Sequence, residues 1–131
     1  MSREAESARI WKTPTPIAIE RGAIYFVNFN PSKGTEAGKI RSALVVQSDL
    51  LNEVGHPSTT VVPLTTQLID GAAPLRLRIA ARDRLAREFD LMLDQIRTID
   101  NRRFNGEMLT RLEGEEMMLV EEYLRILLGL E

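Results

Sequence analysis

The sequence predicts a mainly β domain, a small and strongly bent sheet or barrel of about five or more strands with helical additions and a C-terminal helix. Short runs rich in β-branched and aromatic residues recur through the middle of the chain, and turn residues separate them. The last dozen residues instead have a helical period. With 131 residues and no visible internal repeat, one domain with one core is expected.

Composition excludes several classes of protein. Hydrophobic residues make up 44% and charged residues 27%, which is typical of a soluble globular protein, and no apolar run approaches the length of a membrane span. The chain has no cysteine, which excludes disulfides and thiolate chemistry and fits a cytoplasmic location. The net charge of -2 argues against non-specific binding of duplex nucleic acid but allows a local basic cleft.

Residues 1–20 are expected to form a flexible N-terminal tail, which leaves a domain over residues 21–131. The tail has no steady period, carries Pro14 and Pro16, and lacks the apolar centre of a secretory signal. Its apolar residues suggest that part of it docks on another surface.

Five stretches have the composition of strands, namely residues 23–29, 43–46, 59–65, 75–79 and 91–99. The first is apolar on both faces, which predicts a central strand. Pro63 cannot donate to a ladder, so its strand is expected to lie at an edge or to bend there. The fourth stretch alternates Arg76 and Arg78 with apolar residues, so one face of this strand is expected to be exposed to solvent.

Helical structure is expected in two places. Residues 48–52 predict a short helical turn capped by Ser48. Apolar residues between Leu119 and Leu130 cover an arc of about 200° on a helical wheel, so this helix is either wedged into the core or in contact with another subunit. Residues 82–89 are either a helical turn or a charged loop.

Common catalytic motifs are missing from the sequence. The one histidine, His56, lies in a Gly-Pro loop, and no nucleotide-binding or metal-binding pattern occurs. The glutamates near the last helix suit its N-terminal end and its solvent face better than a metal site. Neither a metal ion nor a cofactor is therefore expected.

Arginine and hydroxyl chemistry remains available. Arg41 lies where a glycine-containing polar loop becomes a strand. A cation at this place is either an anion-binding residue or an ordinary surface arginine at a strand end. If Thr65 ends on the same side of the sheet, the two groups could hold a phosphate. RNA supplies its own nucleophile, the 2′-hydroxyl, so such a site could cleave RNA without a metal.

Five blocks resemble, in order, those of the MazF/PemK/Kid toxin family: RGAIYF (21–26), NPSKGTE (30–36), RSALVVQ (41–47), VPLTTQ (62–67) and DQIRTID (94–100). The resemblance implies an SH3-like or CcdB-like barrel that forms a homodimer. It also implies a sequence-specific, metal-independent endoribonuclease that cleaves single-stranded mRNA and is neutralised by a cognate antitoxin. The expected products are a 2′,3′-cyclic phosphate and a 5′-hydroxyl.

By this resemblance, Arg41 and Thr65 correspond to the proposed catalytic pair of the family. Polar residues that correspond to the RNA-binding groove are Thr35, Glu36, Gln67, Asp94 and Gln95. The chain departs from the pattern at Ser42, where the family usually has proline. A scheme from another branch needs a histidine and an arginine at the positions of Thr35 and Met92, so Asp94 is taken as RNA-facing or structural.

A rival interpretation keeps the fold without the nuclease activity. The chain could be a gyrase poison of the CcdB kind, or a relative that binds an antitoxin but no longer cleaves RNA, because a fold does not determine a function.

Overall fold

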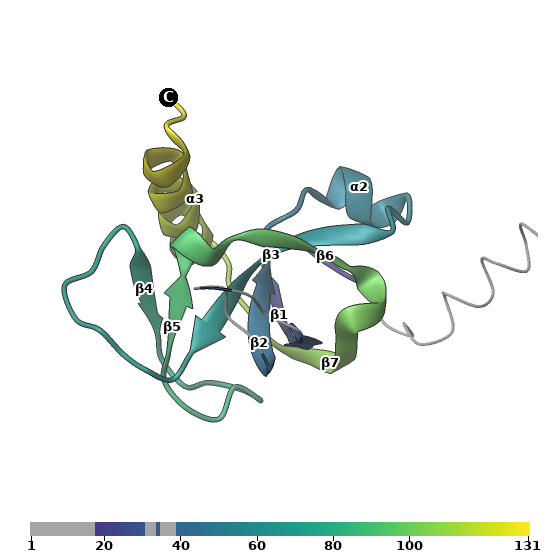
Figure 1. Cartoon of the computed structure of the whole chain (residues 1–131), viewed down its shortest axis with the longest axis horizontal. Helices are drawn as coiled ribbons and strands as arrows, with labels where there is room; N and C mark the ends of the chain where they lie inside the picture. Colours follow the sequence, from purple (N-terminus) through teal and green to yellow (C-terminus); the bar gives the residue numbers. More distant parts are fainter. Residues whose placement is uncertain (1–17, 31–33, 35–38) are drawn as a thin grey trace, which may run out of the picture.

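Seven strands form one antiparallel sheet in the computed structural model of the chain, which describes residues 18–30, 34 and 39–131 (Figure 1). In chain order they are β1 (Ala23–Asn28), β2 (Ile40–Val45), β3 (Ser58–Thr65), β4 (Arg76–Ile79), β5 (Phe89–Met92), β6 (Arg97–Asp100) and β7 (Phe104–Arg111). The sheet order is β4-β5-β3-β2-β1-β7, and β6 pairs with β3 off this path. Because β4 and β7 are not paired with each other, the bent sheet is an open barrel, which confirms the predicted mainly β fold.

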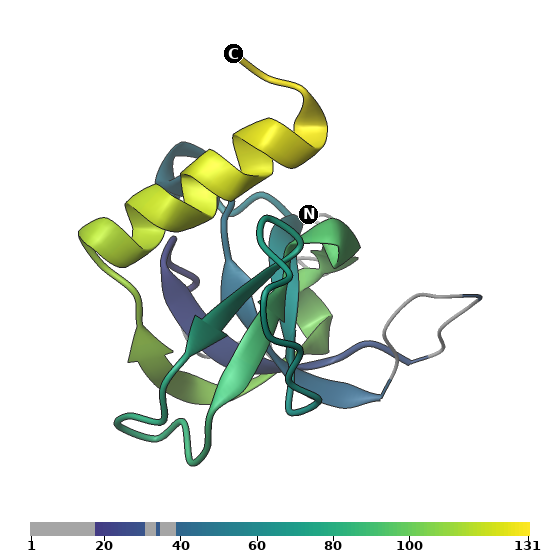
Figure 2. The ribbon, with the colours of Figure 1, turned by 90° about the vertical axis from the view of Figure 1, so that its left-hand side faces the viewer.

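Two α-helices and two 3-10 turns complete the described chain: α2 (Asp49–Glu53), α3 (Glu115–Leu128), η1 (Leu93–Gln95) and η2 (Asn101–Arg103). The Ser48 hydroxyl accepts a hydrogen bond from the Leu50 N–H at 3.1 Å, which confirms the predicted cap of the short helix. Helix α3 ends at Gly129, whose φ of 72° is left-handed and closes the last turn. Figure 2 shows α3 lying across one end of the sheet.

The bent sheet has a core on each face because successive residues of a strand point to opposite sides. On one face, Ile24 packs with residues of β2, β3 and β5 and with Met117 and Val120 of α3. On the other face, the ring of Tyr25 meets that of Phe104 edge to face, with centroids 5.5 Å apart. This double burial explains why β1 is apolar at nearly every position.

Pro63 lies where β3 changes partners. Residues Ser58 to Val61 pair with β6, whereas Leu64 and Thr65 pair with β5, so the ladder on that side is interrupted at the proline. On its other side β3 pairs with β2 through Val61, Val62 and Pro63. The strand is therefore internal to the sheet, and only a local gap accommodates the missing donor.

The prediction of a single strand over residues 91–99 is wrong. Strand β5 ends at Met92, η1 turns the chain, and β6 begins at Arg97. The turn changes the antiparallel register with β3, from the Leu64–Leu91 pair to the Val61–Arg97 pair. Strand β7 was not predicted, and residues 82–85 form a turn within a loop, so the loop alternative holds for this segment.

Helix α3 is confirmed, and its wide apolar arc divides into two faces. Met117 and Val120 are buried, and Tyr123, Leu124 and Leu127 pack against the same core. Other apolar side chains stay exposed, namely Met118, Ile126, Leu128 and, beyond the helix, Leu130. In the part of the chain that the structure describes, no helix is long and apolar enough to cross a membrane.

Candidate active site

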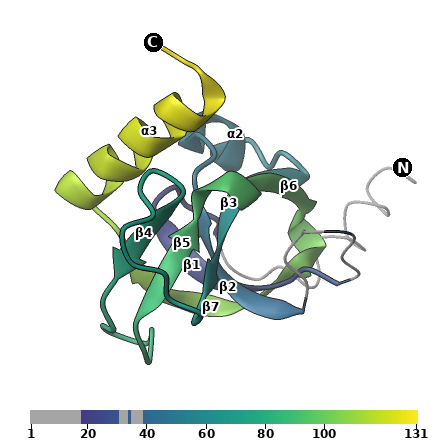
Figure 3. The same ribbon diagram turned by 60° about the vertical axis from the view of Figure 1, so that its left-hand side comes forward.

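Arg41 and Thr65 are brought together by the register of β2 and β3. The two strands pair from Val45–Val61 to Ala43–Pro63, and Arg41 and Thr65 each lie two residues beyond the last pair, at the same end of the two strands. Arg41 Nη1 lies 3.5 Å from the carbonyl oxygen of Leu64, so the guanidinium reaches across to the neighbouring strand. The side-by-side course of β2, β3 and β5 can be followed in Figure 3.

Thr65 is almost fully buried, and its hydroxyl oxygen accepts one hydrogen bond. The N–H of Gln67 donates to Thr65 Oγ1 at 3.1 Å. A hydroxyl has one donor and two acceptor sites, so this contact leaves the O–H of Thr65 available to donate. The arrangement suits recognition of an anionic oxygen.

The two side chains line the same pocket, which has a volume of about 260 Å³. The pocket combines cationic, hydroxyl and apolar groups and is lined by Phe26, Ile40, Arg41, Ser42, Leu64, Thr65, Thr66, Arg87 and Phe89. Guanidinium and hydroxyl donors match the oxygens of a phosphodiester. Phe26 and Ile40 are exposed, so the apolar rim of the pocket is open to solvent and to a ligand.

The other predicted site residues lie apart from this pocket or outside the described chain. Gln67 is exposed, and it follows the pocket residues Thr65 and Thr66 directly. Asp94 and Gln95 belong to η1, beyond the far end of β5, and neither lines the pocket. The structure does not describe Thr35 and Glu36, which lie in the segment between β1 and β2.

A buried carboxylate holds the segment that follows Thr65. Asp90 of β5 pairs in register with Thr65 and is completely buried. It accepts hydrogen bonds from Arg78 Nε at 2.6 Å and from Arg76 Nη1 at 3.1 Å. It also accepts one from the N–H of Ile69 at 2.9 Å. Burial alone raises the pKa of Asp90, but the hydrogen bonds from Arg78 and Ile69 outweigh it, so that the net pKa lies below its usual value.

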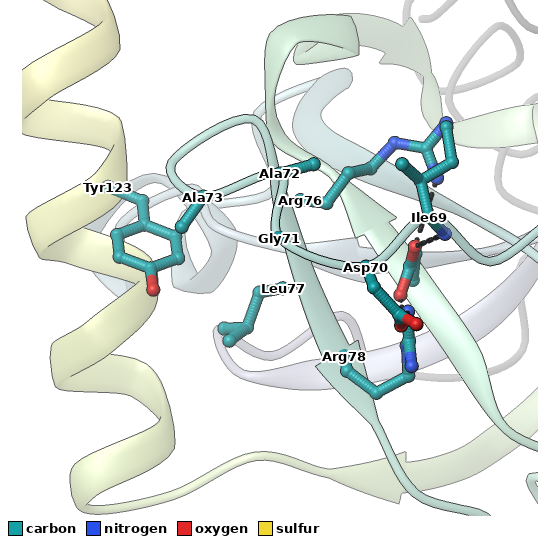
Figure 4. Close-up of a pocket in the computed structure, with 10 residues that line it drawn as sticks. Ile69, Asp70, Gly71, Ala72, Ala73, Arg76, Leu77, Arg78 and Tyr123 are labelled. Atoms are coloured by element: carbon teal, nitrogen blue, oxygen red, sulfur yellow. Dashed lines mark hydrogen bonds and ion pairs between the residues drawn. The ribbon is translucent and has the colours of Figure 1, made fainter.

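This cluster borders a second pocket of about 230 Å³, on the side of the loop that faces α3 (Figure 4). Arg76 Nη1 also donates to the carbonyl oxygen of Gln67 at 3.0 Å, and Arg78 Nη2 donates to Asp70 Oδ1 at 2.9 Å. Both arginines are thus committed to holding the β3–β4 loop. The clamp fixes the backbone next to the Thr65 hydroxyl.

Sequence reasoning did not single out Arg87, Ser42, Thr66 or Phe26 as site residues. Arg87 is one of several arginines in a polar stretch, and Phe26 has the pattern of an ordinary strand residue, so no local signal marks either of them. Only the sheet order brings their four segments to one pocket. Among the described residues, no three histidine or acidic side chains gather in a way that could hold a metal ion.

Comparison with known proteins identifies relatives over most of the chain. Residues 20–128 match a family described as PemK-like, MazF-like toxin of type II toxin-antitoxin system. Endoribonuclease EndoA of Bacillus subtilis (strain 168) is 36% identical over 113 residues, which cover 86% of this chain and 96% of EndoA.

Solved structures share the fold at lower identity. MazF from Deinococcus radiodurans superposes with a TM-score of 0.73 at 24% identity. The match covers 87% of this chain and 99% of the MazF chain. A MazE-MazF structure from the same organism gives a TM-score of 0.68 at 24% identity, with 88% of this chain and 100% of the other chain covered. The family match over residues 20–128 and the identity to EndoA show that this chain belongs to the PemK-like, MazF-like family of type II toxins.

Proposed function

We propose that this protein is a sequence-specific, metal-independent endoribonuclease toxin that cleaves single-stranded mRNA. The observation that carries the proposal is the pocket in which Arg41 and Thr65 present a guanidinium and a hydroxyl to one small volume. Membership of a family that includes Endoribonuclease EndoA supports the reaction class. An mRNA substrate implies action in the cytoplasm.

The chemistry follows from what these two groups can do. The 2′-oxygen of the RNA attacks phosphorus and loses its proton to solvent, while the bond from phosphorus to the 5′-oxygen breaks. The departing 5′-oxygen takes a proton from solvent, so the products are a 2′,3′-cyclic phosphate and a 5′-hydroxyl. Arg41 stabilises the charge that develops on the phosphate oxygens, because a guanidinium keeps its proton at neutral pH and is a poor base.

Thr65 donates its hydroxyl hydrogen to the same phosphate. The hydrogen bond from the Gln67 N–H occupies one of the two acceptor sites of this hydroxyl and leaves its O–H available to donate. Because the donor is already positioned, little reorganisation is needed as the reaction proceeds.

Bases on either side of the cut are read by polar side chains of an RNA-binding groove. We assign this role to the polar side chains that match the groove of the family, namely Thr35, Glu36, Gln67, Asp94 and Gln95. Short polar groups can hydrogen-bond the edges of unstacked bases, and exposed Phe26 offers a ring for stacking.

Two protein partners are part of the proposal. The family description and the MazE-MazF structure support a cognate antitoxin that binds and neutralises the toxin. The exposed apolar side chains on and just beyond α3 support pairing of two copies, because such a surface is unfavourable in water.

The test is cleavage of single-stranded RNA by the purified protein in EDTA. We expect discrete cuts that end in a cyclic phosphate. Arg41→Ala and Thr65→Val should each lower kcat by about 10²–10³-fold, the range for loss of one donor that stabilises a transition state. Thr65→Ser should keep most of the activity because it keeps the hydroxyl.

Arg102→Ala serves as the matched control, because Arg102 is an exposed arginine paired with Asp100 at η2 and does not line the pocket. Its cleavage rate should equal that of the wild type. Intact RNA together with inhibition of gyrase supercoiling would instead support the rival interpretation as a gyrase poison.

A further inference from the structure

Arg87 differs from the arginines near it because it has no anionic partner among the described residues. Three positions earlier in the same loop, Arg84 pairs with Glu107, with Nη1 and Oε1 2.9 Å apart. Arg82 donates to Glu116 Oε1 at 2.8 Å. Arg87 makes no hydrogen bond or ion pair within residues 18–30, 34 and 39–131, and it lines the pocket that contains Arg41 and Thr65. Its charge is therefore available to a ligand.

We infer that Arg87 is a second phosphate-binding residue of this pocket, an inference that rests on the proposed ribonuclease function. A phosphodiester carries two non-bridging oxygens, and two guanidinium groups can bind both of them or bind successive phosphates of one strand. Arg41 comes from β2 and Arg87 from the loop before β5, so the two cations reach the pocket from separate segments.

The surroundings of the two arginines give them different tasks. Arg41 is partly buried and reaches the Leu64 carbonyl, so its position is fixed where charge develops. Arg87 is exposed, and water and salt screen its attraction to phosphate. Arg87 therefore contributes to binding of the RNA before the reaction, and its effect falls on KM more than on kcat.

The matched pair of variants is Arg87→Gln and Arg84→Gln. Both remove one exposed positive charge from the same loop, but only the first removes a charge from the pocket. Their KM and kcat values are measured with a single-stranded RNA in EDTA over a series of salt concentrations. Affinity is measured on the same RNA with a 2′-deoxy nucleotide at the mapped cut, which removes the nucleophile.

We expect Arg87→Gln to raise KM and the dissociation constant about tenfold at low salt while kcat stays within twofold. The slope of log affinity against log salt should become shallower by about 0.7, the value for one phosphate contact on a single strand. Arg84→Gln should change neither constant by more than twofold, and Arg87→Lys should keep the wild-type salt slope. Unfolding midpoints of the variants check that the fold is intact.

Equal constants for Arg87→Gln and Arg84→Gln, with wild-type cleavage present, would overturn the role of Arg87 and leave the proposed nuclease standing. A loss of kcat at unchanged KM would overturn the assignment to phosphate binding. Absence of cleavage by the wild-type protein would count against the proposed function itself. The two hypotheses are thus tested separately.

Discussion

At the scale of single residues, the hydroxyl of Ser42 stands out because it is buried without a hydrogen-bond partner among the described residues. Ser42 follows Arg41 directly and lines the same pocket. A buried hydroxyl without a partner costs free energy, since it loses its hydrogen bonds to water and gains none in return. The serine thus weakens the fold slightly at the candidate active site.

Replacement of this serine is therefore expected to stabilise the protein. Ser42→Ala should raise the free energy of unfolding by about 1 kcal/mol, measured by urea denaturation. Thr59→Val is the matched contrast, because Thr59 Oγ1 donates to Asn101 Oδ1 at 2.6 Å and its loss leaves that acceptor unpaired. This variant should lower the free energy of unfolding by about 1 kcal/mol. A destabilised Ser42→Ala protein would contradict the prediction.

At the scale of structural elements, the Asp90 cluster joins β5, β4 and the loop after β3. The carboxylate is buried, whereas Arg76 and Arg78 each keep part of their side chain in water. Asp90→Asn leaves two arginines without this counter-charge, so the free energy of unfolding should fall by about 2–3 kcal/mol at pH 7, less than for a fully buried pair. Asp70→Asn is the control, because Asp70 is exposed and Arg78 is its one ion-pair partner among the described residues.

The same cluster predicts a pH dependence. The pKa of Asp90 is lower in the folded protein than in the unfolded chain, so its ionisation stabilises the fold above the unfolded pKa of about 4 and this stabilisation is lost as the pH falls below it. The difference in unfolding free energy between wild type and Asp90→Asn should therefore shrink from pH 7 to pH 3. A difference that is constant over this range would show that the Asp90 charge does not stabilise the fold.

At the scale of the whole molecule, the outer face of α3 determines the expected oligomeric state. Met118 and Ile126 are exposed on a helix whose other face is packed on the core. If two copies pair through this face, Ile126→Glu should convert a species of two chains into one chain, measured by light scattering after gel filtration. Leu50→Glu on α2 is the control, because it also replaces an exposed aliphatic residue by glutamate but lies on another helix. An unchanged mass for Ile126→Glu would place the interface elsewhere.

The sequence by itself was sufficient to predict the mainly β fold and to select Arg41 and Thr65 as the candidate catalytic pair. A continuous apolar run reveals a strand that is buried on both faces, as in β1, and an alternating run reveals a strand with one polar face, as in β4. Helical periodicity reveals α3. The order of the sequence blocks led to the toxin family, which the comparisons then showed. Arg41 and Thr65 followed from that resemblance, and their catalytic role remains a proposal.

Only the tertiary structure decided which side chains share the pocket and which stretches are interrupted. Strand β7 was not predicted because exposed polar residues and Gly106 occupy its middle. The stretch 91–99 is interrupted because its two ends pair with β3 in different registers, and η1 takes up the residues between them. The pairing of Asp90 with two arginines and the lack of a partner for Arg87 within the described chain depend on sheet register. Contacts between residues distant in sequence leave no local pattern, so they become visible only when the strands are in place.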